Sequence, residues 1–190
     1  MESPARPAGL RADSARVRAR MLAEARRLLD SGDTDLPMNA LAKAAGVGVG
    51  TVYRHFPSNQ ALLEALAEPG YAALVAMARA AADDPDPAAG MTDLLRAALH
   101  AQLTDASLAA VLSTPGATCR STRDLGQELG EAARRVLDRA RAAGVVRPDV
   151  TPDDVRRLTC GIRHAVRSGG NLDDVDRYLE ILVDGLRPRP

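Results

Sequence analysis

Apolar residues recur along most of this chain at intervals of three and four, the spacing that places side chains on one face of an α-helix. Val17, Met21, Ala25 and Leu28 form such a stripe near the N-terminus. Two more stripes follow one another near the C-terminus: Val155, Leu158, Ile162 and Val166, then Leu172, Val175, Leu179, Leu182 and Leu186. No stretch alternates with period two for long enough to indicate a strand. The pattern predicts an all-α chain of about nine helices.

Proline, glycine and capping residues set the expected ends of these helices. Ser58 is expected to cap the helix after it, and Pro69-Gly70 to kink or break that helix, because an internal proline removes a hydrogen bond. Thr151 to Asp154 has the outline of a capping box. The expected helices span residues 14–31, 38–45, 48–56, 58–82 with the kink or break at Pro69-Gly70, 94–103, 108–112, 122–143, 152–168 and 172–186.

Composition supports helices and excludes several classes of protein. Apolar residues make up 46% of the 190 residues and aromatic residues only 2%, a mixture that favours helix over strand. No apolar run approaches the roughly 18 residues of a membrane span, and the N-terminus lacks the apolar segment of a secretory signal. Cys119 and Cys160 are too few and too far apart for a disulfide framework. We expect a cytoplasmic protein without a membrane partner.

The net charge of zero hides a local excess of positive charge. Residues 11–60 contain eight arginines and lysines but only five acidic residues. One interpretation is a solvated helix face with more arginine than acid. The other is a domain that binds a polyanion, joined to a more acidic domain.

Three glycines, Gly46, Gly48 and Gly50, precede an aromatic and basic cluster. A phosphate-binding glycine loop would need a strand before it, and the third glycine of a dinucleotide motif would fall at Thr51. A helix-turn-helix fits better. Ala42 would then allow the two helices to cross closely, and Gly46 would occupy the turn in a left-handed conformation.

In a helix-turn-helix, Val52 would plug the space between the two helices. Gly48 and Gly50 would let backbone amides approach a phosphate. Thr51, Tyr53, Arg54 and His55 would project from a short helix that a major groove can admit. The alternative is an ordinary helical hairpin with polar residues on its surface.

The stretch "MNALAKAAGVGVGTVYRHFPSNQALLEAL" resembles the DNA-binding signature of the TetR family of transcriptional repressors. The resemblance implies a dimeric repressor that binds a palindromic duplex operator and is released by a small molecule, without a cofactor. It also implies a three-helix DNA-binding domain with the helix-turn-helix at 14–58, and a helical domain for ligand binding and dimerisation at 59–188. The prolines, glycine and arginines of the first dozen residues predict a flexible arm at 1–13. The implied DNA-binding residues are Asn39, Gly48, Val49, Gly50, Thr51, Tyr53, Arg54 and His55.

Two positions depart from the family pattern. Pro37 replaces the serine or threonine that commonly caps the second helix. Asn59 replaces a lysine that commonly meets phosphate at the start of the fourth helix, so the salt dependence of DNA binding should be lower by about one unit. Phe56 is interpreted as a core residue.

The resemblance places a ligand pocket and a dimer interface in the C-terminal domain. The expected pocket residues are Tyr71, Met77, His100, Leu103, Cys119 and His164. The two C-terminal stripes would pack against a second copy as a four-helix bundle, or would only cover their own core. The expected interface residues are Val155, Leu158, Ile162, Val166, Val175, Leu179, Leu182 and Leu186.

Two other kinds of function are weighed against the sequence: a metal- or thiol-responsive regulator and an enzyme. Cys160 and His164 are four residues apart on one helical face, a spacing found among metal ligands, so a thiol- or metal-responsive regulator of the same fold is an alternative. A small cysteine packed in a core is the ordinary interpretation of Cys160. An enzyme is not expected, because the sequence has no zinc-protease motif and no nucleophile elbow.

Overall fold

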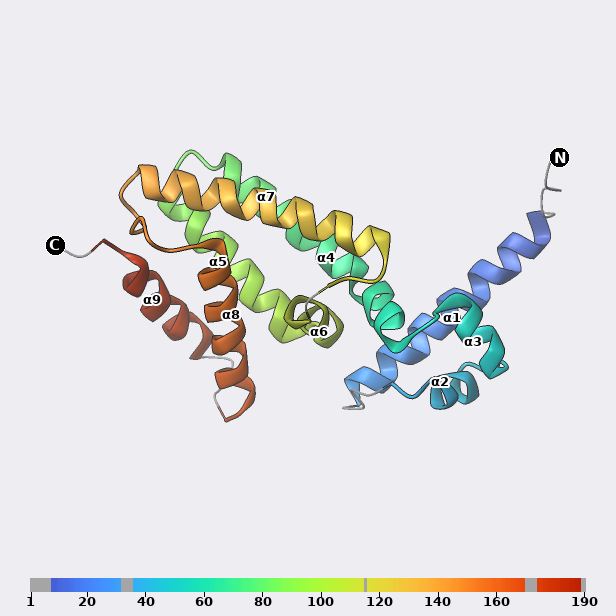
Figure 1. Cartoon of the computed structure of the whole chain (residues 1–190). Helices are drawn as coiled ribbons and strands as arrows, with labels where there is room; N and C mark the ends of the chain where they lie inside the picture. Colours follow the sequence, from blue (N-terminus) through green and yellow to red (C-terminus); the bar gives the residue numbers. More distant parts are fainter. Residues whose placement is uncertain (1–7, 32–35, 115, 170–173, 189–190) are drawn as a thin grey trace. The chain divides into compact units, whose positions relative to one another are not determined.

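The computed structural model describes residues 8–31, 36–114, 116–169 and 174–188. These residues form nine helices and no strand, as Figure 1 shows, which confirms the all-α prediction. The helices are α1 (Ala8–Asp30), α2 (Met38–Ala44), α3 (Val49–His55), α4 (Asn59–Asp83), α5 (Pro87–Thr104), α6 (Ala106–Ser113), α7 (Arg120–Ala142), α8 (Pro152–Arg167) and α9 (Asp174–Leu186). They separate into two compact units, residues 1–66 and 67–190, each described by itself below.

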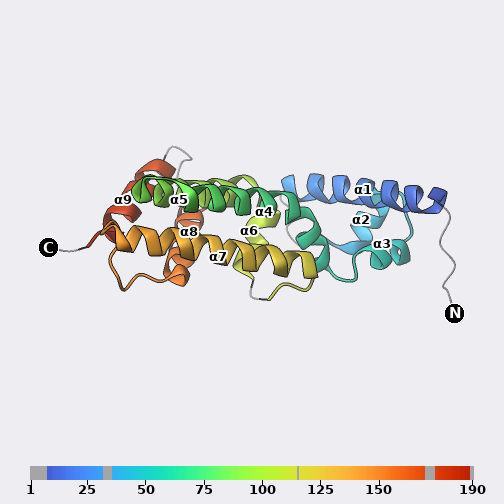
Figure 2. The ribbon, with the colours of Figure 1, turned by 90° about the horizontal axis from the view of Figure 1, so that it is seen from above.

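The first unit is a small helical domain built on α1. In Figure 2, α2 and α3 are seen on the same side of α1. Met21, Ala25 and Leu29 of α1 are buried there against Leu41 and Val52. These three residues repeat every four positions, and this spacing explains why one face of α1 forms the core.

Helix α1 begins earlier than the sequence pattern predicts. The predicted arm extends to residue 13, but the helix starts at Ala8, before the expected start at residue 14. Residues 8–13 contain alanine, leucine and arginine, which are strong helix formers, and no proline. The rest of the predicted arm, residues 1–7, lies outside the described residues, as does Leu172 of the last predicted stripe.

The second unit is built around α5, which packs against α6, α7, α8 and α9. Its core gathers Leu95 and Leu99 of α5, Val136 of α7 and Leu179 of α9, all nearly inaccessible to solvent. Helix α7 ends before Gly144, which has a φ of +70° and so stops the helix as predicted.

Helix α4 runs from Asn59 to Asp83 without a break, although Pro69 lies inside it. Of the two outcomes expected at Pro69-Gly70, a kink or a break, the structure excludes the break. A proline removes one hydrogen bond from a helix, but the residues on both sides of it are anchored, since Leu66 is 3% exposed and Leu74 is 1% exposed. Burial of this apolar face keeps the helix continuous.

Ser58 and Thr151 cap their helices as predicted. The hydroxyl of Ser58 accepts a hydrogen bond from the amide of Ala61, 3.1 Å away. At the start of α8, the Thr151 hydroxyl accepts from the amide of Asp154 at 3.2 Å, and the Asp154 carboxylate accepts from the Thr151 amide at 2.8 Å. This is a complete capping box, with Pro152 in the first turn.

One helix in the described part of the chain, α4, is long and apolar enough to cross a membrane by length and composition alone. An 18-residue window of it has a mean hydropathy of 1.3, and half of that window is buried within the protein. The sequence pattern predicts no such segment, because the hydropathy comes from many alanines rather than from a run of large apolar residues. Core helices pass the same test, so this finding is weak support for a membrane location.

Candidate DNA interface and ligand cavity

Helices α2 and α3 form a helix-turn-helix with the packing expected from the sequence. Ala42 and Ala45 are 5% and 3% exposed, and Val52 is fully buried. Gly46 has a φ of +62°, the left-handed region that favours glycine. The turn places α3 against α2 through a single buried α3 side chain, Val52.

The rest of α3 faces away from this core. Tyr53 is 51% exposed and Val49 41%, while Thr51 and His55 are half-buried. Of the eight predicted DNA-binding residues, those in or next to α3 share this surface: Gly48, Val49, Gly50, Thr51, Tyr53, Arg54 and His55. Asn39 is exposed on α2. The chain thus presents a seven-residue helix with polar, aromatic and basic side chains to solvent.

The aromatic neighbour of this surface has a structural role. Phe56 is 1% exposed, and the guanidinium carbon of Arg18 lies 5.2 Å from the centre of its ring, a cation–π distance. This agrees with the interpretation of Phe56 as a core residue. The contact fixes a basic residue of α1 at the end of α3.

Lys43 is a basic residue near this surface that is absent from the predicted DNA-binding set. Its side chain is exposed at the end of α2, and it forms no ion pair with any residue that the structure describes. Its charge belongs to the basic excess of residues 11–60, and its place in the last turn of α2 could have identified it. At the start of α2, Pro37 occupies the cap position without a side-chain hydrogen bond, as its replacement of a serine or threonine implies.

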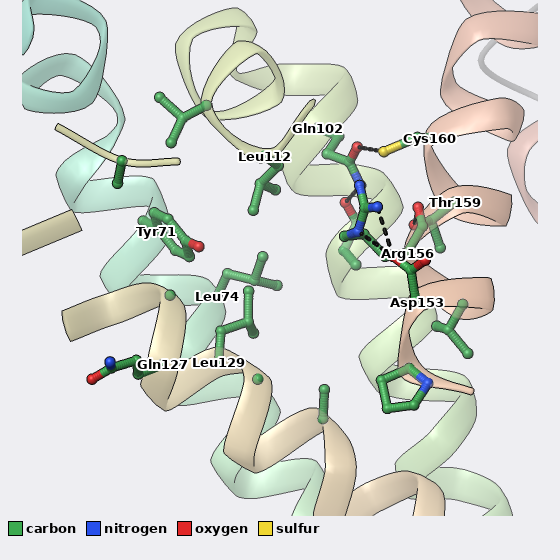
Figure 3. Close-up of a pocket in the computed structure, with 18 of the residues that line it drawn as sticks. Tyr71, Leu74, Gln102, Leu112, Gln127, Leu129, Asp153, Arg156, Thr159 and Cys160 are labelled. Carbon is green, nitrogen blue, oxygen red and sulfur yellow. Dashed lines mark hydrogen bonds and ion pairs between the residues drawn. The ribbon is translucent and has the colours of Figure 1, made fainter. Parts of the chain in front are cut away.

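A cavity of about 620 Å³ lies within the second unit. Its walls come from α4, α5, α6, α7 and α8, and Figure 3 shows leucines of several of these helices facing a common space. Apolar side chains dominate the walls: Leu74, Leu94, Leu95, Val111, Leu112, Leu129 and Val155. The volume is within the range of roughly 300–1,000 Å³ typical of small-molecule sites.

Only Tyr71 of the six expected pocket residues lines this cavity. Met77 is 41% exposed, and His100 and His164 are exposed on helix surfaces. Leu103 and Cys119 are half-buried outside the lining. The expectation failed because sequence position gives the region of a residue but not the side of the helix that it faces.

The cavity has a polar wall that the sequence did not reveal. Gln102 is 3% exposed, and its amide donates to the carbonyl of Ala98 at 3.1 Å. The thiol of Cys160 lies 3.5 Å from the Gln102 side-chain oxygen. Arg156 and Asp153, joined by an ion pair at 2.6 Å, line the same part of the cavity. A histidine or cysteine motif search misses such a wall, because glutamine and arginine are common surface residues.

The two C-terminal stripes pack mainly into their own unit. Val166, Leu179, Leu182 and Leu186 are 2–7% exposed, and Val155, Ile162 and Val175 pack against the same core. Of the eight expected interface residues, only Leu158 is exposed, at 44%. The expectation of an interface made by these stripes is therefore corrected. The amphipathic pattern that suggested a partner is satisfied within the chain.

A second pair of stripes faces outward on α8 and α9. On each helix its members are spaced by three and then four residues: Leu158, Gly161 and Ala165 on α8, and Tyr178, Ile181 and Gly185 on α9. Ile181 is 58% exposed, and a Cβ added at Gly161 or Gly185 would meet nothing within 4 Å. We call this surface the outer α8–α9 face.

Cys160 and His164 contact different partners in the structure. The Cys160 thiol contacts Gln102, whereas the imidazole of His164 lies 3.4 Å from the Ser168 hydroxyl. Within the described ranges, no cluster of three or more histidine, cysteine, aspartate or glutamate residues could hold a metal ion. The structure does not favour the metal-responsive alternative.

Comparisons with known proteins agree with this organisation. A family model described as bacterial regulatory proteins of the tetR family matches residues 21–66. A second, described as the C-terminal domain of SbtR-like transcriptional regulators, matches residues 86–188. The comparison with curated proteins gave no match.

Solved structures show the same fold over nearly the whole chain. A TetR transcription regulatory protein from Mycobacterium vanbaalenii is 30% identical, with 94% of this chain and 99% of that chain covered and a TM-score of 0.52. The TetR transcriptional regulator SCO0520 from Streptomyces coelicolor is 28% identical, with coverages of 91% and 99% and a TM-score of 0.55. RolR in complex with resorcinol, 19% identical with coverages of 94% and 91% and a TM-score of 0.62, shares the fold. The chain belongs to the TetR family of bacterial transcriptional regulators, with a helix-turn-helix DNA-binding domain at its N-terminus.

Proposed function

We propose that this protein is a cytoplasmic repressor that binds a near-palindromic DNA operator as a homodimer and is released when a small molecule enters the cavity of its second unit. The exposed face of α3 supports the DNA-binding part of this proposal. Six of the seven α3 residues are not buried, so they are available to base edges and phosphates without unfolding. This role is that of a regulator and not of an enzyme.

The outer α8–α9 face supports the dimer. Small residues at Gly161, Ala165 and Gly185 allow the helices of a second copy to approach closely, and Leu158 and Ile181 supply exposed apolar area. Two such helices from each copy would form a four-helix bundle about a two-fold axis. A two-fold dimer accounts for a palindromic operator, because each copy then reads one half-site.

The cavity supports ligand control. Its residues Tyr71 and Leu74 belong to α4, which begins directly after the short Phe56–Ser58 connection that ends α3. A ligand that changes the position of α4 would change the separation of the two recognition helices in a dimer. Operator binding needs these helices about 34 Å apart, so a shift of a few ångströms would weaken it. RolR, which shares the fold, has a structure with resorcinol bound.

Selection of DNA from a random duplex library tests this function, because such a library samples many candidate operators at once. We expect the full-length protein to enrich a motif of two inverted half-sites. Tyr53→Ala should lose this binding while its circular dichroism spectrum stays the same, since Tyr53 is half exposed. Met77→Ala, which removes an exposed side chain outside both the cavity lining and the outer α8–α9 face, is the control. No enriched motif, or equal binding by Tyr53→Ala, would refute the proposal.

A further inference from the structure

The cavity combines a mostly hydrocarbon wall with two separate polar features. Leucines of α4, α5, α6 and α7 line it, and Tyr71 is its one aromatic residue. The charged residues in the lining are Arg123, Asp153 and Arg156, an excess of one positive charge. An occupant therefore needs a large apolar part and gains from a single negative charge.

The first polar feature is the hydroxyl of Tyr71. The residue is 8% exposed, and its hydroxyl forms no hydrogen bond with any described residue. Figure 3 shows this hydroxyl directed toward the interior of the cavity. Burial raises the pKa of the Tyr71 phenol, so the group keeps its proton at neutral pH and can donate it. Because this hydroxyl faces the cavity, a ligand oxygen there would accept a hydrogen bond from it.

Gly126 of α7 makes room for this hydroxyl. A Cβ at position 126 would lie 3.2 Å from the Tyr71 oxygen, so any larger residue there would push against it. Because Gly126 has no side chain, the phenol of Tyr71 can occupy this position at the cavity wall.

The second polar feature is Arg156, whose ion pair is shared. The Asp153 carboxylate accepts from Arg156 at 2.6 Å through one oxygen and from Arg157 at 2.8 Å through the other. Arg156 lines the cavity, whereas Arg157 does not. If Arg156 turned to a ligand anion, Asp153 would keep Arg157 as its partner, so no charge would be left unpaired. All three side chains are at least half exposed, so the present pair is weak and easily exchanged.

We infer that the effector is an amphipathic monocarboxylic acid whose carboxylate pairs with Arg156 and whose hydrocarbon body, carrying an acceptor oxygen, reaches the hydroxyl of Tyr71. This inference rests on the proposed ligand-responsive function and names the chemical class of its ligand. The buried carboxamide of Gln102 lines the same wall as Arg156 and offers a further hydrogen bond. The leucine walls enclose the hydrocarbon.

Calorimetric titration of the full-length protein with decanoate, decanol and 10-hydroxydecanoate, whose hydroxyl lies at the far end of the chain from the carboxylate, tests this. Decanoate should bind and decanol should bind at least about tenfold more weakly, because the alcohol lacks the charge. Arg156→Gln should weaken decanoate about ten- to a hundredfold, while Arg157→Gln, which removes the other partner of Asp153, should not. Tyr71→Phe should weaken 10-hydroxydecanoate about two- to tenfold and leave decanoate unchanged.

Several results would overturn the inference: binding of neither acid, equal binding of acid and alcohol, or a dependence on Arg123 instead of Arg156. Circular dichroism and melting temperature show whether each variant is folded, and Arg156→Lys should recover part of the affinity because it restores the charge. The titration contains no DNA, so it is independent of the proposed function. Acid binding without release from the selected DNA would refute ligand control but leave the site, whereas DNA binding without acid binding would refute the site alone.

Discussion

The guanidinium of Arg26 in α1 donates a hydrogen bond to the backbone carbonyl of Leu66 in α4, 2.6 Å away. Leu66 lies one turn before Pro69, which has no amide hydrogen to give to this part of the helix. Arg26 thus supplies a donor to a region of α4 that has one donor fewer than an ordinary helix. It also ties α4 to α1 inside the first unit.

Arg26→Ala should destabilise the first unit by about 1.5–3 kcal/mol, the usual worth of a hydrogen bond to a charged group. Chemical denaturation followed by circular dichroism measures this. The control is Arg27→Ala, because Arg27 is 77% exposed and pairs only with Glu24 of its own helix among the described residues. Its effect should be below about 1 kcal/mol. Equal effects of the two variants would show that the Leu66 contact adds nothing.

Pro69 and Gly70 are the positions at which we expect α4 to absorb motion. A Cβ at Gly70 would lie 3.1 Å from the carboxylate of Asp105, the residue that caps α6 through the amides of Ser107 and Leu108. The double variant Pro69→Ala/Gly70→Ala should stiffen α4 and press on this cap. It should change the ratio of DNA affinities with and without effector more than the affinity without effector. Pro87→Ala is the control, because Pro87 lies in the first turn of α5, where a proline costs a helix little, and does not line the cavity. An unchanged ratio of the two DNA affinities would show that Pro69 and Gly70 do not act as a hinge in effector release.

Two charges should set the salt dependence of operator binding. Lys43→Ala should lower the slope of log affinity against log salt by about 0.9, the value for one phosphate contact. Asn59→Lys, which restores the cation common in the family, should raise it by a similar amount. Fluorescence anisotropy with the selected operator at several salt concentrations measures both. An unchanged slope for either variant would show that the side chain at that position does not contact a DNA phosphate.

The outer α8–α9 face predicts different outcomes for two aspartate substitutions on α9. Ile181→Asp should leave the fold intact and separate the dimer, because Ile181 is 58% exposed in the single chain. Leu179→Asp should unfold the second unit, because Leu179 is 2% exposed and a charge there would be unpaired. Sedimentation velocity and circular dichroism distinguish the two. A folded dimer of Ile181→Asp would exclude this face as the interface.

The capping box of α8 predicts a dependence of stability on pH. Hydrogen bonds from the Thr151 side chain and then from its backbone amide lower the pKa of Asp154. A lowered pKa means that this carboxylate stabilises the fold above its unfolded value of about 3.9, and the contribution is lost as pH falls through the folded value. The difference in melting temperature between the natural protein and Asp154→Asn should therefore be largest at neutral pH and shrink in acid. A difference that is constant with pH would show that the carboxylate charge has no part in the cap.

A structural feature can be predicted from the sequence when it depends on the backbone conformation of a few neighbouring residues. Gly46, Ser58 and the Thr151–Asp154 box can be identified because turns and caps depend on neighbours in the chain. A feature that depends on tertiary packing cannot be predicted in this way. The apolar stripe through Leu179 and Leu186 has the same spacing whether it covers the core of its own chain or contacts a second copy. Met77 and Leu74 are both apolar residues of α4, and only the structure shows that Met77 is exposed and Leu74 is buried. Pro69 is expected to break α4 on local grounds, but burial on both sides outweighs its local cost.

The recognition helix α3 owes its place to one buried side chain, Val52. Folding therefore constrains that position and leaves the others nearly free. Under the proposed function, substitutions at Val49, Gly50 or Tyr53 would alter which bases are preferred at little cost in stability, since surface changes are usually within about 0.5 kcal/mol. During evolution, the preferred operator sequence should therefore change faster than the fold of the domain. Exchanging the residues at these positions between two relatives should transfer sequence specificity without other changes to the domain.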